Sequence, residues 1–233
     1  MTTNENDVIY DWNKRGHTVS PPMRKVRYFD ETLRDGIQCP SVTDPSIEAK
    51  QQMVRLLAQA GVHHVDIGLP GAGPRAVEDC KILAETIRDE KLGIEAACAA
   101  RTHPNDIQPI IDVSQATGVP IEVMTFLGTS PIRLYAEGWD EDLLEKRTRT
   151  AVSLAKGAGL TCTFVTEDTV RSDPKTLRRL FTAALEEGAD GLCVCDTVGH
   201  ATPNGVYNLI HFTKDLIRGL GSDARVDWHG HND

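Results

Sequence analysis

The chain has 233 residues, of which 40% are hydrophobic and 25% charged, a composition typical of globular proteins and long enough for one large domain. Its formal net charge of -9 argues against a nucleic-acid partner, because such partners are bound by neutralising their phosphates with basic side chains. No apolar run is long enough to span a membrane, and the opening MTTNENDVIYDWNKRG is too polar for a secretory signal. The cytoplasm is therefore the expected location.

One pattern recurs from Met23 onward: a short β-branched run, a polar loop, and an amphipathic helix. In chain order, strands are predicted at residues 26–30, 63–69, 93–100, 121–127, 161–167, 191–196 and 225–231. Residues 1–22 are predicted to form a polar amino-terminal extension, and residues 23–233 one domain.

Prolines and glycines mark the expected ends of the helices. Asp44 and Asp173 each precede a proline, so their carboxylates can accept hydrogen bonds from the free N-H groups of the first turn. Glycine tolerates the positive φ that often ends a helix, and successive helices are predicted to close at Gly61, Gly118, Gly159 and Gly188. The helix after Pro203 is predicted to bury one face, made of Val206, Leu209, Ile210, Thr213, Leu216, Ile217 and Leu220.

Strands that alternate with helices indicate a parallel sheet covered on both faces. A repeat of roughly 30 to 40 residues, without a glycine-rich dinucleotide motif, favours an α/β fold of the (β/α)8 TIM-barrel class over a doubly wound sheet. The sequence supplies seven strands where a closed barrel needs eight. We therefore expect a barrel domain that is incomplete at its carboxyl end. A partner chain that closes the barrel, or a strand before Met23, is the alternative.

The six cysteines fall mostly in predicted strand or helix interiors. Because the chain lacks a secretory signal, we expect them to be reduced and buried. Cys193 and Cys195 place two sulfurs on one strand face, but no further metal ligands are evident beside them.

Active sites of such barrels lie at the carboxyl ends of the strands. The polar residues at these ends are Arg34, Asp35, Asp66, Arg101, Thr129, Ser130, Glu167, Asp196, Thr197, His229 and His231. His229 and His231 are two residues apart, so both can point to one side of a strand. Together with Asp35 they could bind one divalent ion, Mg, Mn, Co or Zn, and leave positions open for substrate oxygens. Alternatively, Asp35 caps a loop and the histidines form hydrogen bonds in the barrel mouth.

Four sequence motifs resemble those of a known family. FDETLRDGIQ is similar to the first-strand signature of the metal-dependent barrel family that includes 2-isopropylmalate synthase, homocitrate synthase and 3-hydroxy-3-methylglutaryl-CoA lyase. FLGTSPIRL, CDTVGHATP and HGHND resemble later motifs of that family in the same order. The likeness favours the synthases. It implies an acyltransferase that condenses acetyl-CoA with a 2-oxo acid in leucine or related amino-acid biosynthesis, and that acts as a homodimer with a divalent metal.

The resemblance also implies roles for individual residues. Asp35, His229 and His231 would be the metal ligands. Arg34 and Glu167 would be catalytic: Arg34 would hold the substrate carbonyl and the developing enolate oxygen, and Glu167 would lie near the reacting groups. The substrate-binding residues would be Arg34, Gln38, Asp66, Arg101, Ser130 and Thr197.

Several of these residues also have a purely structural interpretation. Arg34 could form a salt bridge in the barrel mouth, and Glu167 could stabilise a loop. Asp66 and Arg101 could pair across neighbouring strands, which would explain both without catalysis. Ser130, like Thr129, could cap the segment that follows it.

Three residues depart from the synthase pattern: Glu31, Ile37 and His200. They surround the expected oxo-acid pocket, so the acid is not identified. Two alternatives for function stay open: a metal-dependent acyl-CoA lyase or oxo-acid aldolase of the same family, and a non-catalytic fragment that lacks strand eight. A non-haem iron oxygenase fits neither the architecture nor the order of ligands.

Overall fold

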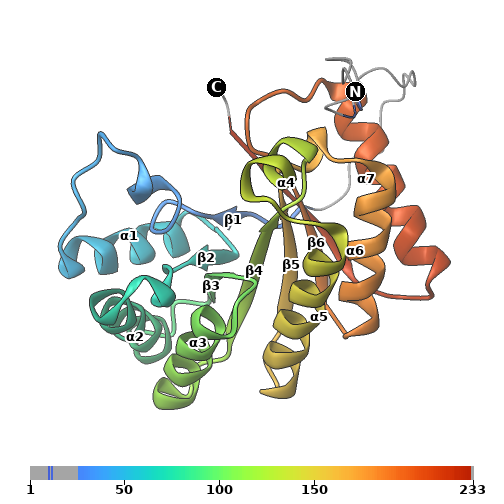
Figure 1. The fold of residues 1–233 in the computed structure, drawn as a ribbon. Helices are drawn as coiled ribbons and strands as arrows, with labels where there is room; N and C mark the ends of the chain where they lie inside the picture. The colour runs from blue at the N-terminus through green and yellow to red at the C-terminus, as the bar shows by residue number, and fades with distance from the viewer. Residues whose placement is uncertain (1–9, 11, 13–25, 232–233) are drawn as a thin grey trace. The chain divides into compact units, whose positions relative to one another are not determined.

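The computed structural model describes Tyr10, Trp12 and residues 26–231 (Figure 1). Seven strands lie within these residues: β1 (Phe29–Asp30), β2 (His64–Asp66), β3 (Glu95–Arg101), β4 (Ile121–Gly128), β5 (Cys162–Glu167), β6 (Gly191–Asp196) and β7 (Arg225–Gly230). They are hydrogen-bonded in chain order, and the pairings β1–β2, β2–β3, β5–β6 and β6–β7 are parallel. The expected alternation of parallel strands and helices is confirmed.

Helices connect these strands. They are α1 (Ile47–Gln59), α2 (Pro74–Asp89), α3 (Pro104–Thr117), α4 (Pro131–Glu137), α5 (Glu141–Gly157), α6 (Pro174–Glu186) and α7 (Pro203–Gly219), with short 3-10 turns η3 (Gly36–Gln38), η4 (Pro70–Ala72) and η5 (Thr169–Arg171). Among the described residues, none of the helices has the length and apolar character that crossing a membrane requires.

The chain separates into two compact units. The β1–β3 unit comprises residues 26–124 and 157–161, and the β5–β7 unit comprises residues 125–156, residues 162–231, Tyr10 and Trp12. Strand β4 begins in the first unit and ends in the second.

In the β1–β3 unit the core lies between strand β3 and helices α2 and α3. The five residues Ala96 to Ala100 of β3 are all buried, as expected for a parallel strand covered on both faces. Leu83 on α2 and Ile107 and Ile110 on α3 are fully buried. This apolar packing supports the strand ends that carry Arg34 and Asp66.

In the β5–β7 unit every residue of β6 is buried, as expected for a parallel strand covered on both faces, and β5 and β7 pair with its two edges. Phe164 of β5 meets Phe181 of α6 edge to face, with ring centroids 6.4 Å apart. On α7 the predicted apolar face is confirmed for Leu209, Thr213, Leu216 and Ile217. Leu220 was wrongly included, because it lies beyond the last helical residue and is exposed.

The two predicted aspartate caps behave differently. Asp173 caps α6 as predicted, accepting a hydrogen bond of 2.7 Å from the Lys175 N-H. The prediction for Asp44 is wrong: α1 starts later, and its cap is Ser46, whose hydroxyl accepts from the Ala49 N-H at 3.3 Å. The Asp44 carboxylate instead pairs with Lys50 and Arg75.

The four glycines predicted to close helices all have positive φ: 81° at Gly61, 69° at Gly118, 76° at Gly159 and 89° at Gly188.

Five cysteines are buried as expected, but Cys39 is exposed, because it lies in the loop after η3 rather than in a strand or helix. Strand β1 is shorter than the predicted residues 26–30. The predicted extension 1–22 lies outside the described residues apart from Tyr10 and Trp12.

Candidate active site and metal centre

The histidine pair lies at the carboxyl end of β7. His229 is opposite Cys195 of β6 in the parallel register, and Gly230 is opposite Asp196. The Nε2 atoms of His229 and His231 are 3.2 Å apart, so the two imidazoles converge on one side of the strand as the two-residue spacing predicts.

This geometry fits the donor set of a divalent-metal site. At a metal–nitrogen bond length of about 2.1 Å, two ligands on one ion lie about 3.0 Å apart in octahedral geometry and about 3.4 Å apart in tetrahedral geometry. The observed 3.2 Å lies between these values, although it also suits a hydrogen bond between the two rings. The third predicted ligand, Asp35, belongs to the β1–β3 unit, and its role stays a prediction.

Arg34 lies among carboxylates in the turn after β1. Its guanidinium pairs with Glu31, with Asp35 Oδ1 at 3.2 Å and with Asp66 Oδ2 at 3.4 Å. The side chain is only 17% exposed. These contacts hold the guanidinium at the carboxyl end of β1 and β2, so the salt-bridge interpretation is observed. They fix the orientation that a catalytic cation also needs.

Asp66 is the last residue of β2 and is completely buried. Burial raises the pKa of its carboxyl group to about 7, and this effect exceeds the opposing influence of Arg34 and of the N-H groups that it accepts. Its Oδ1 accepts from the Gly68 N-H at 3.0 Å, whereas Oδ2 has no hydrogen-bond partner among the residues that the structure describes. The sequence placed this residue correctly at a strand end but did not identify its partner.

The predicted pairing of Asp66 with Arg101 is wrong. Arg101 makes a two-point ion pair with Asp106, in which Nε and Oδ2 are 2.6 Å apart and Nη2 and Oδ1 are 2.9 Å apart. Asp106 lies only five residues further on, in the first turn of α3, so a local partner competes successfully with the neighbouring strand. Arg101 is largely exposed, and its substrate-binding role stays a prediction.

Ser130 and Thr197 both have structural partners. The Ser130 hydroxyl caps α4 by accepting from the Arg133 N-H at 3.4 Å, as the structural interpretation predicts. Thr197 Oγ1 accepts from the Asp168 N-H at 2.8 Å, which leaves the hydroxyl proton available to donate to another acceptor.

Glu167, the last residue of β5, lies near one cation that the sequence analysis did not single out. The nearest atoms are its Oε1 and Arg133 Nε, 3.9 Å apart. Arg133 stands inside the quoted stretch FLGTSPIRL, but nothing in its spacing indicates which strand end it faces. Three-dimensional packing alone reveals that pair.

The paired thiols of β6 are buried, as the core interpretation of Cys193 and Cys195 predicts. Their mutual hydrogen bond and burial raise the pKa of the Cys193 thiol well above its ordinary value.

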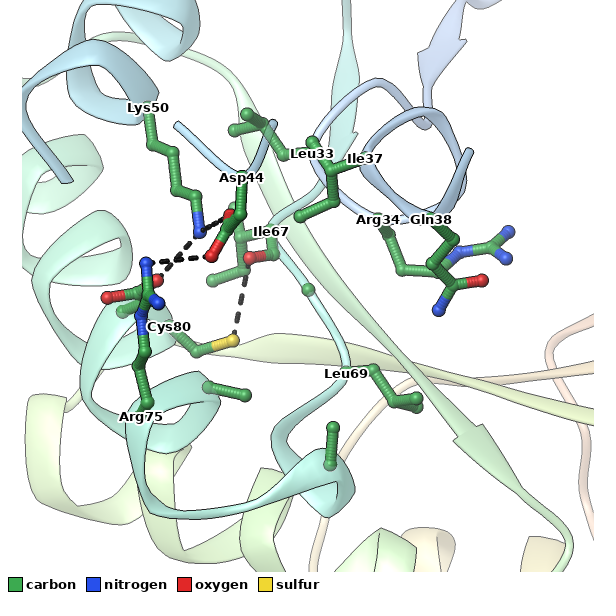
Figure 2. A pocket seen from close by; sticks show the side chains of 14 residues that line it. Leu33, Arg34, Ile37, Gln38, Asp44, Lys50, Ile67, Leu69, Arg75 and Cys80 are labelled. Carbon is green, nitrogen blue, oxygen red and sulfur yellow. Dashed lines mark hydrogen bonds and ion pairs between the residues drawn. The ribbon is translucent and has the colours of Figure 1, made fainter. Parts of the chain in front are cut away.

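A cavity of about 310 Å³ opens beside Arg34 within the β1–β3 unit (Figure 2). Its walls are mostly apolar and include Leu33, Ile37, Ile67 and Leu69, and Gln38 lies next to Arg34 at one end. The opposite end carries a cluster of Asp44, Lys50 and Arg75, which Asp79 joins through its ion pair with Lys50. In that cluster Lys50 Nζ is 2.8 Å from Asp44 and 2.7 Å from Asp79, which neutralises its buried charge.

Residues 25–233 match the family described as HMGL-like. The chain is 33% identical over 219 residues to a 2-isopropylmalate synthase of Sulfurisphaera tokodaii, covering 94% of the chain and 53% of that protein. It is 36% identical over 216 residues to a 2-isopropylmalate synthase of Dictyoglomus turgidum, covering 91% of the chain and 41% of that protein. The chain thus spans about half, or less, of the length of these relatives.

Solved structures show the same fold. The HMG-CoA lyase of Bacillus subtilis superposes with a TM-score of 0.67 at 20% identity, covering 91% of the chain and 70% of that structure. The hydroxymethylglutaryl-CoA lyase of Pseudomonas aeruginosa gives 0.64 at 18% identity, covering 89% and 67%. At these identities the likeness supports the TIM-barrel class of fold and not a shared reaction.

Proposed function

The chain belongs to the HMGL-like family, and from this premise we propose that its protein is an acyltransferase that condenses acetyl-CoA with a 2-oxo acid. The observation that carries the proposal is the identity of 33% and 36% to proteins named 2-isopropylmalate synthase, over more than nine-tenths of the chain. The expected product is a 2-alkylmalate or a homocitrate-like acid. We also propose that the protein works as a cytoplasmic homodimer.

We propose that Asp35, His229 and His231 hold a divalent metal, and the convergent imidazoles support this assignment. When bound, such an ion supplies Lewis-acid polarisation of a carbonyl group. The two histidines must be neutral to act as ligands, so metal binding is expected to weaken as the pH falls and the rings are protonated.

The chain's own residues then supply charge and orientation. Arg34 is held by its carboxylate neighbours, so its fixed donors can stabilise the oxyanion that develops on the enolate. Thr197 keeps its hydroxyl proton for the carboxylate of the 2-oxo acid, because its oxygen already accepts from Asp168. Glu167 can hold a proton or a water at the end of β5.

Release of free thiol from acetyl-CoA tests the proposal directly. The complete protein would be incubated with acetyl-CoA, a divalent metal and a panel of 2-oxo acids, and thiol would be measured over time. Condensation predicts release that depends on one of the acids and on the metal. No release with any acid would refute the synthase function.

A lyase is the alternative within the same family. It would cleave a 3-hydroxyacyl-CoA such as 3-hydroxy-3-methylglutaryl-CoA to acetyl-CoA without releasing thiol. The similar structures named as lyases support the fold only. Incubating the same preparation with that thioester, and measuring acetyl-CoA by chromatography, separates the two reactions.

A further inference from the structure

Arg133 occupies an unusual position at the carboxyl end of β4. It lies in the short helix α4, and its side chain runs back across Gly128, the last residue of the strand. A β-carbon at position 128 would overlap Arg133 Cγ and lie 3.1 Å from its Nε. Only glycine therefore leaves room for this path of the side chain.

The guanidinium that reaches the strand end is held loosely. Within the described part of the chain it donates no hydrogen bond; Glu137 Oε1 is 3.4 Å from Nη1, and Glu167 Oε1 is 3.9 Å from Nε. Its centre lies 5.9 Å from the Trp139 ring. The side chain is 43% exposed, and an exposed ion pair with such distances contributes little to stability.

Stability therefore does not account for the arrangement. A glycine at the end of a strand lowers stability, because it loses more backbone entropy on folding than other residues do. The ion pairs that this glycine permits contribute little to stability. Gly128 does allow the Arg133 guanidinium to lie at the strand ends, where barrel active sites form. Among the described residues its N-H donors have no close partner, so they are available to bind a ligand.

The register of strands β5 to β7 gives the distance between Glu167 and His229. Thr166 is in register with Val194, and Cys195 with His229, so Glu167 is level with His229 two strands away. Two strand spacings amount to about 10 Å. An extended arginine and an imidazole can both reach toward a small molecule across that distance.

We propose that Arg133 is the anion-binding residue of the acyl-transfer site and receives an oxyanion of the substrate. This inference rests on the proposed condensation. Two substrates could supply that oxyanion. One is a 2-oxo diacid, through the carboxylate remote from its keto group, and the other is acetyl-CoA, through a phosphate. Guanidinium recognises both by paired, charge-assisted hydrogen bonds.

Four variants of the complete protein test the residue. Arg133→Leu is expected to raise the KM of the anion-bearing substrate about tenfold or more with a small change in kcat, since a hydrogen bond to a charged group contributes about 1.5 kcal/mol or more. Arg133→Lys should restore part of the affinity. Gly128→Ala should reproduce the loss although the arginine is retained. Arg147→Leu is the matched control, because Arg147 also lies over Trp139, at 4.7 Å, but belongs to α5.

The choice of substrates identifies the anion. If it is a phosphate, Arg133→Leu raises the KM for acetyl-CoA but not for acetyl-pantetheine, which lacks phosphate. If it is a carboxylate, the variant lowers kcat/KM for 2-oxoglutarate relative to 2-oxoisovalerate. An unchanged KM for every substrate in Arg133→Leu, or an equal loss in Arg147→Leu, overturns the inference.

Calorimetry separates this inference from the proposed function. Titration of wild type and Arg133→Leu with coenzyme A and with 2-oxoglutarate measures anion binding without turnover. If wild type is inactive yet binds one of them in an Arg133-dependent manner, the acyl-transfer proposal fails and anion recognition stands. Equal affinity in both proteins contradicts anion recognition.

Discussion

At the scale of single residues, the partners of each candidate functional residue determine its charge and its orientation. Arg34 is surrounded by carboxylates, Asp66 is buried beside it, and the two histidines converge at the end of β7. The sequence identified these residues by position alone. Their ionisation depends on burial and on the partners that they contact. The structure therefore supports a prediction for each residue that its position at a strand end could not.

Asp66 should make stability fall as the pH rises. Its pKa is raised to about 7 in the folded chain, above the value of 3.8 for an exposed carboxyl group, so the folded state retains a proton that the unfolded state loses. The stabilising effect is complete below pH 4 and disappears as the pH passes 7. Asp66→Asn should remove this slope, so wild type should lose stability relative to the variant between pH 4.5 and pH 8.

Urea unfolding at the two pH values measures the difference. Each pKa unit corresponds to about 1.4 kcal/mol, so the change should amount to a few kcal/mol at most. Asp215→Asn, at an exposed position on α7, is the control. A constant difference between wild type and Asp66→Asn across this pH range would contradict the assignment.

The histidine pair should bind a divalent ion. His229→Ala and His231→Ala are each expected to weaken Mn²⁺ or Zn²⁺ binding at least tenfold, because each removes one ligand. Calorimetry of the metal-stripped protein gives the affinities. His211→Ala, a histidine on α7 whose ring contacts Tyr207, should bind as wild type does. If metal-stripped wild type takes up no ion, the pair is better explained as a hydrogen bond between rings.

At the scale of elements, boundaries were predicted well where a local rule governs them. Glycine positions that require positive φ and the Asp173 cap are set by the backbone within a few residues. Asp44 shows the limit of the rule, because Ser46 stands closer to the first turn of α1 and displaces it as the cap. Its carboxylate then pairs with Lys50, on the first turn of the same helix, and with Arg75, which is distant in the sequence.

The two aspartates should therefore respond differently to salt. Asp173→Ala is expected to cost about 1 kcal/mol through loss of a capping hydrogen bond, with little dependence on ionic strength. Asp44→Ala should destabilise mainly at low salt, since it removes a partner of the buried Lys50 cation. Urea unfolding of both variants at 20 mM and 500 mM salt makes the comparison. Equal salt dependence would show that the two carboxylates act alike.

At the scale of the whole molecule, the metal proposal joins residues from two units. Asp35 belongs to the β1–β3 unit and the histidine pair to the β5–β7 unit. If all three bind one ion, adding metal should protect amides near η3 and in β7 from hydrogen exchange together, and raise the melting temperature. In Asp35→Asn the protection near η3 should be lost. Protection of β7 alone in wild type would show that Asp35 is not a ligand.

The sequence by itself determined the order of strands and helices, the family, and the strand-end positions from which the candidate site is drawn. The elements and the strand ends follow from periodicity and from residues that act locally, and the family follows from the resemblance of four short motifs, so a linear pattern is sufficient. Only the tertiary structure decided which charges meet: Asp66 contacts Arg34 and not Arg101, and Arg133 crosses Gly128 to face Glu167. An ion pair requires atoms within about 4 Å, and that proximity depends on packing between segments far apart in the chain.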